Sequence, residues 1–248
     1  MWDLINVLAL AFLGSIIALV GGVVFLLKKS WSNFLSAYSV PFAAGVMITV
    51  ALLSLLPEAM ELGGEKSLLV ILFAFLFSYL FENFFCDLHH HQHECRHHHQ
   101  SKNSAVLVIV GDSIHNFIDG LAIAATYLVN PGLGLITTLS TFLHEVPHEI
   151  GDFGILLKAG YSRKKVLMIN FFSACTTFLG ASFVIVTHNE KSIAVMIAIA
   201  AGMFLYLGAS DFLPQIHEEK ISKNKALLAL SLGVLAMLLT IFLIPHEH

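Results

Sequence analysis

Two short segments of the chain contain residue types that hydrophobic surroundings normally exclude. Residues 115–120 (HNFIDG) and 144–149 (HEVPHE) each lie near the middle of a long apolar stretch. A charge at the centre of a membrane-spanning helix costs roughly 2.5–3.5 kcal/mol on insertion scales. Asp119, Glu145 and Glu149 therefore need compensation, and a bound cation is the simplest form of it.

Helical spacing places these side chains on shared faces. His115 and Asp119 are four residues apart, with Asn116 beside them, and residues at i and i+4 share a helix face. The second segment contains two more such pairs, which are His144 with His148 and Glu145 with Glu149. The tight turn predicted at residues 130–132 (NPG) makes the two helices antiparallel neighbours, so both sets of side chains should meet at one depth.

The side-chain chemistry favours a metal ion over a purely structural role. Imidazole, carboxylate and carboxamide groups together suit a borderline divalent ion such as Zn²⁺ or Fe²⁺, whereas Mg²⁺ and Ca²⁺ prefer all-oxygen shells. The structural alternative is a set of polar groups that join helices by hydrogen bonds. For the more peripheral acids, structural and ion-path roles are equally open: these are Asp112, Asp152, Glu82 and Asp211.

A peptidase is the alternative function. Residues 144–148 (HEVPH) match the H-E-x-x-H pattern, in which His144 and His148 would bind Zn²⁺ and Glu145 would be the general base. On this interpretation the chain would be an intramembrane zinc metalloprotease. The proline within the pattern, and the polar residues of the first segment that it leaves unused, argue against it.

Composition predicts the elements that hold these residues. The chain has 248 residues, of which 57% are hydrophobic and 12% charged, and its mean hydropathy is +0.81. These values predict an all-α polytopic membrane protein with one transmembrane domain over residues 1–248. Eight apolar runs reach the length of a spanning helix, at about 5–27, 34–56, 67–86, 104–129, 133–157, 166–187, 193–213 and 226–244.

The basic residues predict the orientation of these helices. Eleven of the thirteen Lys and Arg residues fall in the loops after helices 1, 3, 5 and 7, and only Lys66 and Lys191 fall on the other side. The positive-inside rule places the first set of loops in the cytoplasm and both termini outside it. No basic patch remains that would favour nucleic acid.

An internal repeat predicts how the helices are arranged. Residues 44–47 (AGVM) and 56–58 (LPE) resemble residues 201–204 (AGMF) and 213–215 (LPQ), with twelve residues from Gly to Pro in both. By the predicted orientation the two helices run in opposite directions. They therefore indicate inverted repeats, helices 1–3 and 6–8, around helices 4–5, unless two apolar helices resemble each other by chance.

One loop is long. Residues 87–103 contain seven histidines and Cys95 on the predicted cytoplasmic side. Such a tract is typical of a weak metal-binding segment, and a solvated loop with incidental histidines is the alternative.

The two motifs resemble those of one known family. Residues 111–125 (GDSIHNFIDGLAIAA) resemble the HNxxDG signature of the ZIP (Zrt-, Irt-like) divalent metal transporters, and residues 144–160 (HEVPHEIGDFGILLKAG) resemble the HExPHExGD form of one subfamily. The resemblance implies eight helices in a 3+2+3 arrangement and no enzymatic activity. It also implies import of Zn²⁺, or of Fe²⁺ or Mn²⁺, as substrate and not as cofactor. The implied transport site lies between helices 4 and 5 and consists of His115, Asn116, Asp119, His144, Glu145, His148 and Glu149.

The chain departs from the family where some members place a metal-binding glutamate, since residues 172–174 read FSA. A single metal site is therefore preferred to a pair. The expected partners are divalent ions and the lipid bilayer, with a homodimer as candidate assembly, and the expected location is a bacterial inner membrane.

Overall fold

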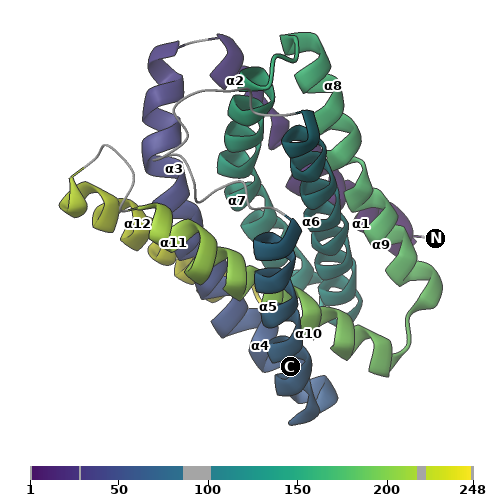
Figure 1. Cartoon of the computed structure of the whole chain (residues 1–248). Helices are drawn as coiled ribbons and strands as arrows, with labels where there is room; N and C mark the ends of the chain where they lie inside the picture. The colour runs from purple at the N-terminus through teal and green to yellow at the C-terminus, as the bar shows by residue number, and fades with distance from the viewer. Residues whose placement is uncertain (1, 28, 86–101, 217–221, 247–248) are drawn as a thin grey trace.

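The computed structural model describes residues 2–27, 29–85, 102–216 and 222–246, and every regular element within them is a helix (Figure 1). In chain order these are α1 (Trp2–Ala11), the π-helical η1 (Phe12–Ile16), α2 (Leu19–Leu27), α3 (Lys29–Val50), the π-helical η2 (Ala51–Leu55), α4 (Leu56–Gly63), α5 (Lys66–Phe85), α6 (Lys102–Val129), α7 (Pro131–Lys158), α8 (Arg163–Ala174), α9 (Thr176–Thr187), α10 (Glu190–Tyr206), the π-helical η3 (Leu207–Phe212), α11 (Leu213–Gln215) and α12 (Lys223–Leu243). The predicted His-rich loop at 87–103 lies outside the described residues, apart from its last two, which begin α6.

Helices of membrane-spanning length dominate the described chain. Six of its helical stretches are long and apolar enough to cross a membrane, namely Trp2–Val24, Tyr38–Gly63, Ala105–Val129, Arg163–Thr187, Glu190–Phe212 and Lys223–Leu243. α5 and α7 are not among these six. In α7 the polar side chains that sequence analysis singled out lower the hydropathy of a helix of 28 residues. The all-helical membrane class is thus confirmed, with six candidate spans where eight were predicted.

α6 and α7 form the centre of the bundle (Figure 1). They pack against each other, with α9 against α6 and α3 against α7. Only Asn130 separates them, and its side chain accepts hydrogen bonds from the backbone N–H groups of Gly132 (2.7 Å) and Leu133 (3.4 Å). An asparagine cap followed by proline at the first helical position is a strong helix start. The predicted tight turn at 130–132 is therefore confirmed, and it sets the two motif-bearing helices side by side.

Several helix pairs meet backbone to backbone at glycines. A Cβ at Gly120 of α6 would overlap the carbonyl oxygen of Thr177 in α9, and one at Gly180 of α9 would overlap that of Phe117 in α6. Gly45 of α3 faces the backbone of α12 in the same way, and Gly202 of α10 faces that of α5. Small residues that let helix backbones approach closely are a main means of helix association in membranes.

π-helical segments interrupt three of the helical stretches. η2 and η3 each end directly before a Leu-Pro pair, at residues 56–57 and 213–214. η1 lies in the first stretch and packs against α7. Such irregular turns are frequent at functional sites because they redirect side chains and free backbone groups.

Candidate metal site

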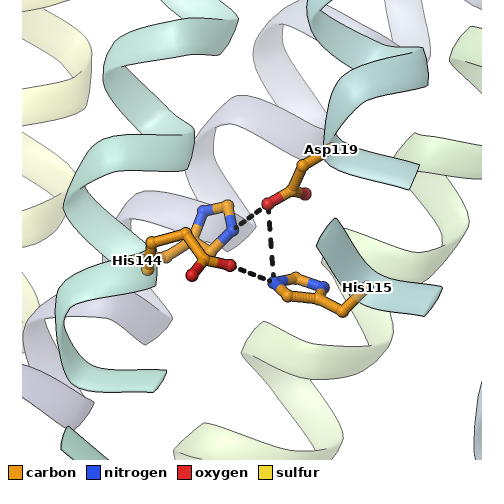
Figure 2. A group of neighbouring side chains, drawn as sticks. His115, Asp119 and His144 are labelled. Atoms are coloured by element: carbon orange, nitrogen blue, oxygen red, sulfur yellow. Dashed lines mark hydrogen bonds and ion pairs between the residues drawn. The ribbon is translucent and has the colours of Figure 1, made fainter. Parts of the chain in front are cut away.

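Four of the predicted ligands converge in the centre of the bundle. The buried group, as we call it, consists of His115, Asp119, His144 and Glu145, and Figure 2 shows both imidazoles pointing at the Asp119 carboxylate. Asp119 Oδ2 lies 3.2 Å from His144 Nε2 and 3.6 Å from His115 Nε2, and His115 Nε2 lies 3.1 Å from Glu145 Oε1. One ligand atom from each residue lies within 4.8 Å of all the others.

The polar atoms of the buried group are poorly satisfied by protein. His115 and Glu145 are close but lack hydrogen-bond geometry, so both nitrogens of His115 and both oxygens of Glu145 have no hydrogen-bond partner. The Asp119 and Glu145 side chains are 0% exposed. Buried polar groups without partners are costly, so their accumulation at one point needs a reason. Ligand atoms that converge on a common ion would have this geometry.

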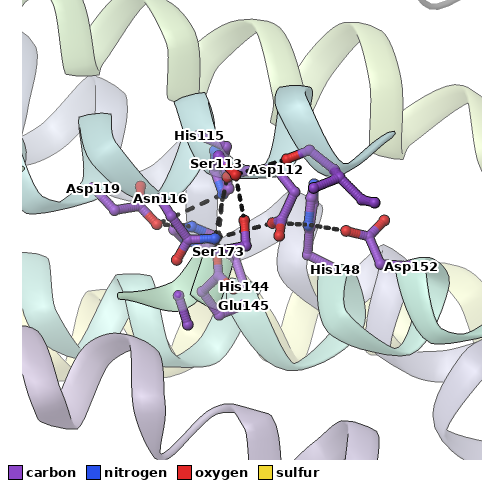
Figure 3. Close-up of polar contacts among 12 residues, drawn as sticks. Asp112, Ser113, His115, Asn116, Asp119, His144, Glu145, His148, Asp152 and Ser173 are labelled. Carbon is purple, nitrogen blue, oxygen red and sulfur yellow. Dashed lines mark hydrogen bonds and ion pairs between the residues drawn. The ribbon is translucent and has the colours of Figure 1, made fainter. Parts of the chain in front are cut away.

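A second group lies next to the first (Figure 3). The cavity group consists of Asp112, His148 and Asp152, whose ligand atoms also lie within 4.8 Å of one another. His148 Nδ1 lies 3.5 Å from Asp112 Oδ1 and 3.8 Å from Asp152 Oδ2. In this conformation His148 therefore lies with Asp112 and Asp152, two acids for which the sequence leaves structural and ion-path roles equally open.

Asn116 is buried, and its amide is occupied by other protein groups. Its oxygen accepts hydrogen bonds from Ser15 Oγ (2.9 Å) and Thr177 Oγ1 (3.0 Å), and its nitrogen donates to Asp112 Oδ1 (2.9 Å). The amide thus connects η1, α6 and α9, and it orients the carboxylate of Asp112. Asn116 thus lies next to the ligand-type side chains and orients Asp112, but it belongs to neither group.

Glu149 belongs to neither group but interacts with both. It is 1% exposed, and neither of its carboxylate oxygens has a hydrogen-bond partner. It interacts electrostatically with Glu145 of the buried group and with Asp112, His148 and Asp152 of the cavity group. The rings of His115 and His148 stack with centroids 4.8 Å apart, so the groups are immediate neighbours.

A cavity of about 630 Å³ is lined by His115 of the buried group and by the whole cavity group. Its lining also includes Glu82, Tyr206 and Asp211. Tyr206 donates a hydrogen bond to Glu82 and so links α10 to α5 across the cavity wall. The His148 side chain is 19% exposed whereas those of His144 and Asp119 are 0%, so access improves from the buried group to the cavity group.

The two acids that were not among the predicted ligands carried a usable signal. Asp112 precedes His115 by three residues and Asn116 by four, and Asp152 follows His148 by four. Each therefore shares a helix face with a predicted ligand. What the spacing could not give is the register of α6 against α7, which decides that Asp112 meets His148.

The grouping also bears on the peptidase interpretation. In the H-E-x-x-H mechanism His144 and His148 bind one Zn²⁺ and the glutamate acts on a water. Here His144 belongs to the buried group with Glu145, and His148 belongs to the cavity group. That separation does not favour proteolysis.

The fold and the site together define a class: an all-helical membrane protein with a buried histidine–carboxylate site reached by a cavity. Comparison with known families narrows it. The protein-family model described as "ZIP Zinc transporter" matches residues 86–241, which is well over half of the chain. The chain therefore belongs to this family.

Curated relatives agree with the family. The "Metal cation symporter ZIP8" of Rattus norvegicus is 41% identical over 121 residues, which are 48% of this chain and 26% of that protein. The "Metal cation symporter ZIP14" of Mus musculus is 41% identical over 126 residues, 50% of this chain and 26% of that protein. The "Zinc transporter foi" of Drosophila melanogaster is 41% identical over 133 residues, 53% of this chain and 19% of that protein.

The matches span only 19% to 26% of these relatives' own lengths. All three relatives are animal proteins, so they lend no support to the predicted bacterial inner membrane. Transport, and not catalysis, is the activity that the family description names.

Proposed function

We propose that this chain transports divalent metal ions across a membrane, with Zn²⁺ as the preferred substrate and Fe²⁺ or Mn²⁺ as alternatives. The observation that carries the proposal is the convergence of four buried ligand-type side chains from α6 and α7 at one point of an apolar helical bundle. Imidazoles mixed with carboxylates suit such borderline ions. Glu149 and His148 complete the proposed transport site, and Asn116 orders it.

The proposed architecture is one transmembrane domain of eight spans, in which helices 1–3 and 6–8 are inverted repeats around α6 and α7. The glycine contacts support it, because Gly45 in the second span faces the eighth (α12) and Gly202 in the seventh faces the third (α5). The irregular turns support it as well, because η2 and η3 occupy matching places before a Leu-Pro pair. Repeats of this kind build alternating access around a midplane site.

We propose that both termini lie outside and that metal moves toward the cytoplasm. The cavity is lined by Glu82, Asp152 and Asp211, which stand near the helix ends that the basic residues place inside. On the other side Ser140 and Thr141 are buried. These observations support a conformation that is open toward the proposed cytoplasmic side. A metal ion would enter past the acids of α4 and its following turn, Glu58, Glu61 and Glu65.

Uptake of radiolabelled zinc into proteoliposomes tests the proposal. Wild-type protein is compared with protein-free vesicles and with the Asp119→Ala/His148→Ala double variant, reconstituted to the same protein density. Zinc that accumulates only with wild type is the expected result. Zinc that binds to wild-type protein without entering the vesicles would contradict transport.

A homodimer stays a prediction, which a measurement of the molar mass of the purified protein in detergent would check.

Uptake is expected to weaken as the external pH falls. Histidine must be neutral and carboxylates ionised to bind metal, so protons compete with Zn²⁺ for the buried group and binding releases protons. We expect at least a tenfold loss of zinc affinity between pH 7.5 and pH 5.5, measured as the half-saturating zinc concentration. This tenfold figure is on the order of one proton displaced over one to two pH units. Affinity that is constant over this range would count against histidine ligands.

Removal of residues 89–99 is expected to leave transport intact. These residues contain seven histidines and are separate in sequence from the ligands of both groups, so we propose that their role is regulation or local metal buffering. Initial uptake rates of the deletion variant at saturating zinc should stay within about twofold of wild type, with apparent affinity free to change. Complete loss of transport in folded protein would make this segment part of the path.

A further inference from the structure

We propose that the turn between α7 and α8 binds the headgroup of an anionic phospholipid, whose acyl chains lie along the exposed apolar face of α8. This lipid site uses no residue of the metal site. It requires neither metal binding nor transport, so it is tested separately from the proposed function.

Four basic residues fall within eight positions at one end of the bundle (Figure 1). Lys158 ends α7, and Arg163, Lys164 and Lys165 form the first turn of α8. All four are exposed. No Asp or Glu occurs within residues 153–189, and every ion pair among the described residues involves a histidine. In the described part of the chain these four charges therefore have no ion-pair partner.

Three of these charges lie where they destabilise the helix itself. The first turn of α8 contains no acidic residue and three consecutive basic ones. A helix N-terminus carries a partial positive charge, which favours anions and disfavours cations in the first turn. A phosphate beside these side chains would offset the repulsion.

A cleft of about 310 Å³ lies beside the charges. It is lined by Ser162, Lys164, Lys165, Met168, Ile169 and Phe172. Lys165, Met168 and Phe172 follow one another by three and four positions, so they share a face of α8. Met168 is 49% exposed and Phe172 64%. The cleft thus combines positive charge at the helix end with exposed apolar side chains farther along the same face.

The order of these groups along α8 matches a phospholipid. α8 begins the candidate span Arg163–Thr187, so its basic turn lies at the boundary of the bilayer and its later turns lie within it. A headgroup at the basic turn would place its acyl chains against Met168 and Phe172. A free anion would use the charges alone. Basic clusters next to a spanning helix are known to attract anionic lipids.

The turn that carries the charges has a defined shape. Gly160 has a φ of 88°, a conformation that glycine adopts without strain. The backbone N–H groups of Gly160 and Tyr161 donate to the carbonyls of Leu157 (3.0 Å) and Leu156 (3.1 Å). Lys165 Nζ lies 4.6 Å from the centroid of the Tyr161 ring, in cation–π range. Groups that are already ordered lose less entropy when a ligand binds.

Native mass spectrometry tests the site by counting bound lipids. The purified protein in neutral detergent is titrated with phosphatidylglycerol, without added metal, and the lipids bound per chain are counted. Lys164→Gln/Lys165→Gln should weaken binding of the tightest lipid roughly tenfold, because two charges next to the headgroup are removed. Both lysines are exposed, so the variant should fold. Phosphatidylcholine, which has no net charge, should bind wild type and variant equally.

Lys223→Gln/Lys225→Gln is the matched control. These two exposed lysines lie in the first turn of α12, which also begins after a serine. This variant should bind the tightest phosphatidylglycerol within about twofold of wild type. Equal losses in the two double variants would show a general attraction to basic residues and would overturn a site at the α7–α8 turn.

The apolar half of the site is tested by Phe172→Ala. This change should weaken phosphatidylglycerol binding about threefold, because it removes apolar area that the chains cover. Leu179→Ala in α9 alters a side chain that is also 64% exposed, and it should change nothing. Glycerol 3-phosphate, which has a headgroup's chemistry without chains, should not displace the lipid. Displacement by it, together with unchanged binding to Phe172→Ala, would identify a free-anion site and overturn the lipid site.

Discussion

Asn in place of Asp119 is expected to abolish metal uptake. Asp119 Oδ2 lies 3.6 Å from His115 Nε2 and 3.2 Å from His144 Nε2, and the carboxylate is completely buried. Asparagine keeps the size of the side chain but removes its charge, so a bound cation loses its central anionic ligand. Loss of a ligand's outer partner alone costs 10–100-fold in metal affinity, so loss of the ligand should cost at least about a hundredfold. Zinc uptake into proteoliposomes and zinc binding to purified protein measure the two effects.

Thr126→Val is the matched control. Thr126 lies two turns farther along α6, is equally buried, and donates only to the carbonyls of Ala122 and Ile123 in its own helix. Its loss should leave uptake within about twofold, because replacing a satisfied hydroxyl by an isosteric methyl is a small change. Near wild-type uptake by folded Asp119→Asn would remove Asp119 from the site.

The second large effect expected is on stability, from Gly180→Ala. The added methyl group would overlap the carbonyl oxygen of Phe117 across the α6–α9 contact. The atoms it meets belong to the backbone of α6 and cannot rotate away, so the two helices must separate. Overpacking of this kind costs roughly 3 kcal/mol. We expect a large fall in the thermal midpoint, measured as monodisperse protein remaining after heating in detergent.

Gly154→Ala serves as the comparison for that change. A Cβ at Gly154 in α7 would meet nothing within 4 Å, and alanine favours helix over glycine by up to about 1 kcal/mol. The variant should be as stable as wild type or slightly more so. Equal midpoints for Gly180→Ala and Gly154→Ala would show that the α6–α9 backbone contact does not limit stability.

The spacing of residues along the sequence correctly predicted how the two central helices and their polar faces are arranged. The i, i+4 relation of His115 and Asp119 predicted a shared face, and their side chains do approach to 3.6 Å. The turn at 130–132 predicted antiparallel neighbours, because asparagine, proline and glycine each have a defined preference at a helix junction. These features depend on a few consecutive residues, which is why the sequence alone was enough.

Features that depend on contacts between distant segments were not predictable in the same way. His148 follows His144 by four positions, yet it lies beside Asp112 because of how α6 and α7 are rotated against each other. Asn116 offers the donor and acceptor groups of a ligand, but Ser15 and Thr177 from two other elements occupy its oxygen. Neither partner is near it in sequence. The eight predicted spans came from apolar length, and α7 falls short by composition because it contains the site.

The glycine contacts described in the fold have a mechanical consequence. Where two helix backbones touch, a slide by one residue would bring a Cβ into the neighbouring backbone, so the pair resists shear. Gly45 joins α3 to α12, Gly202 joins α5 to α10, and Gly120 with Gly180 joins α6 to α9. Each pair should therefore move as one rigid body. Any rocking motion must then be taken up between pairs. α6 and α7, which carry both ligand groups, also meet at a glycine, because a Cβ at Gly134 would overlap the backbone of Tyr127. These two helices should therefore move together and carry the site as a unit.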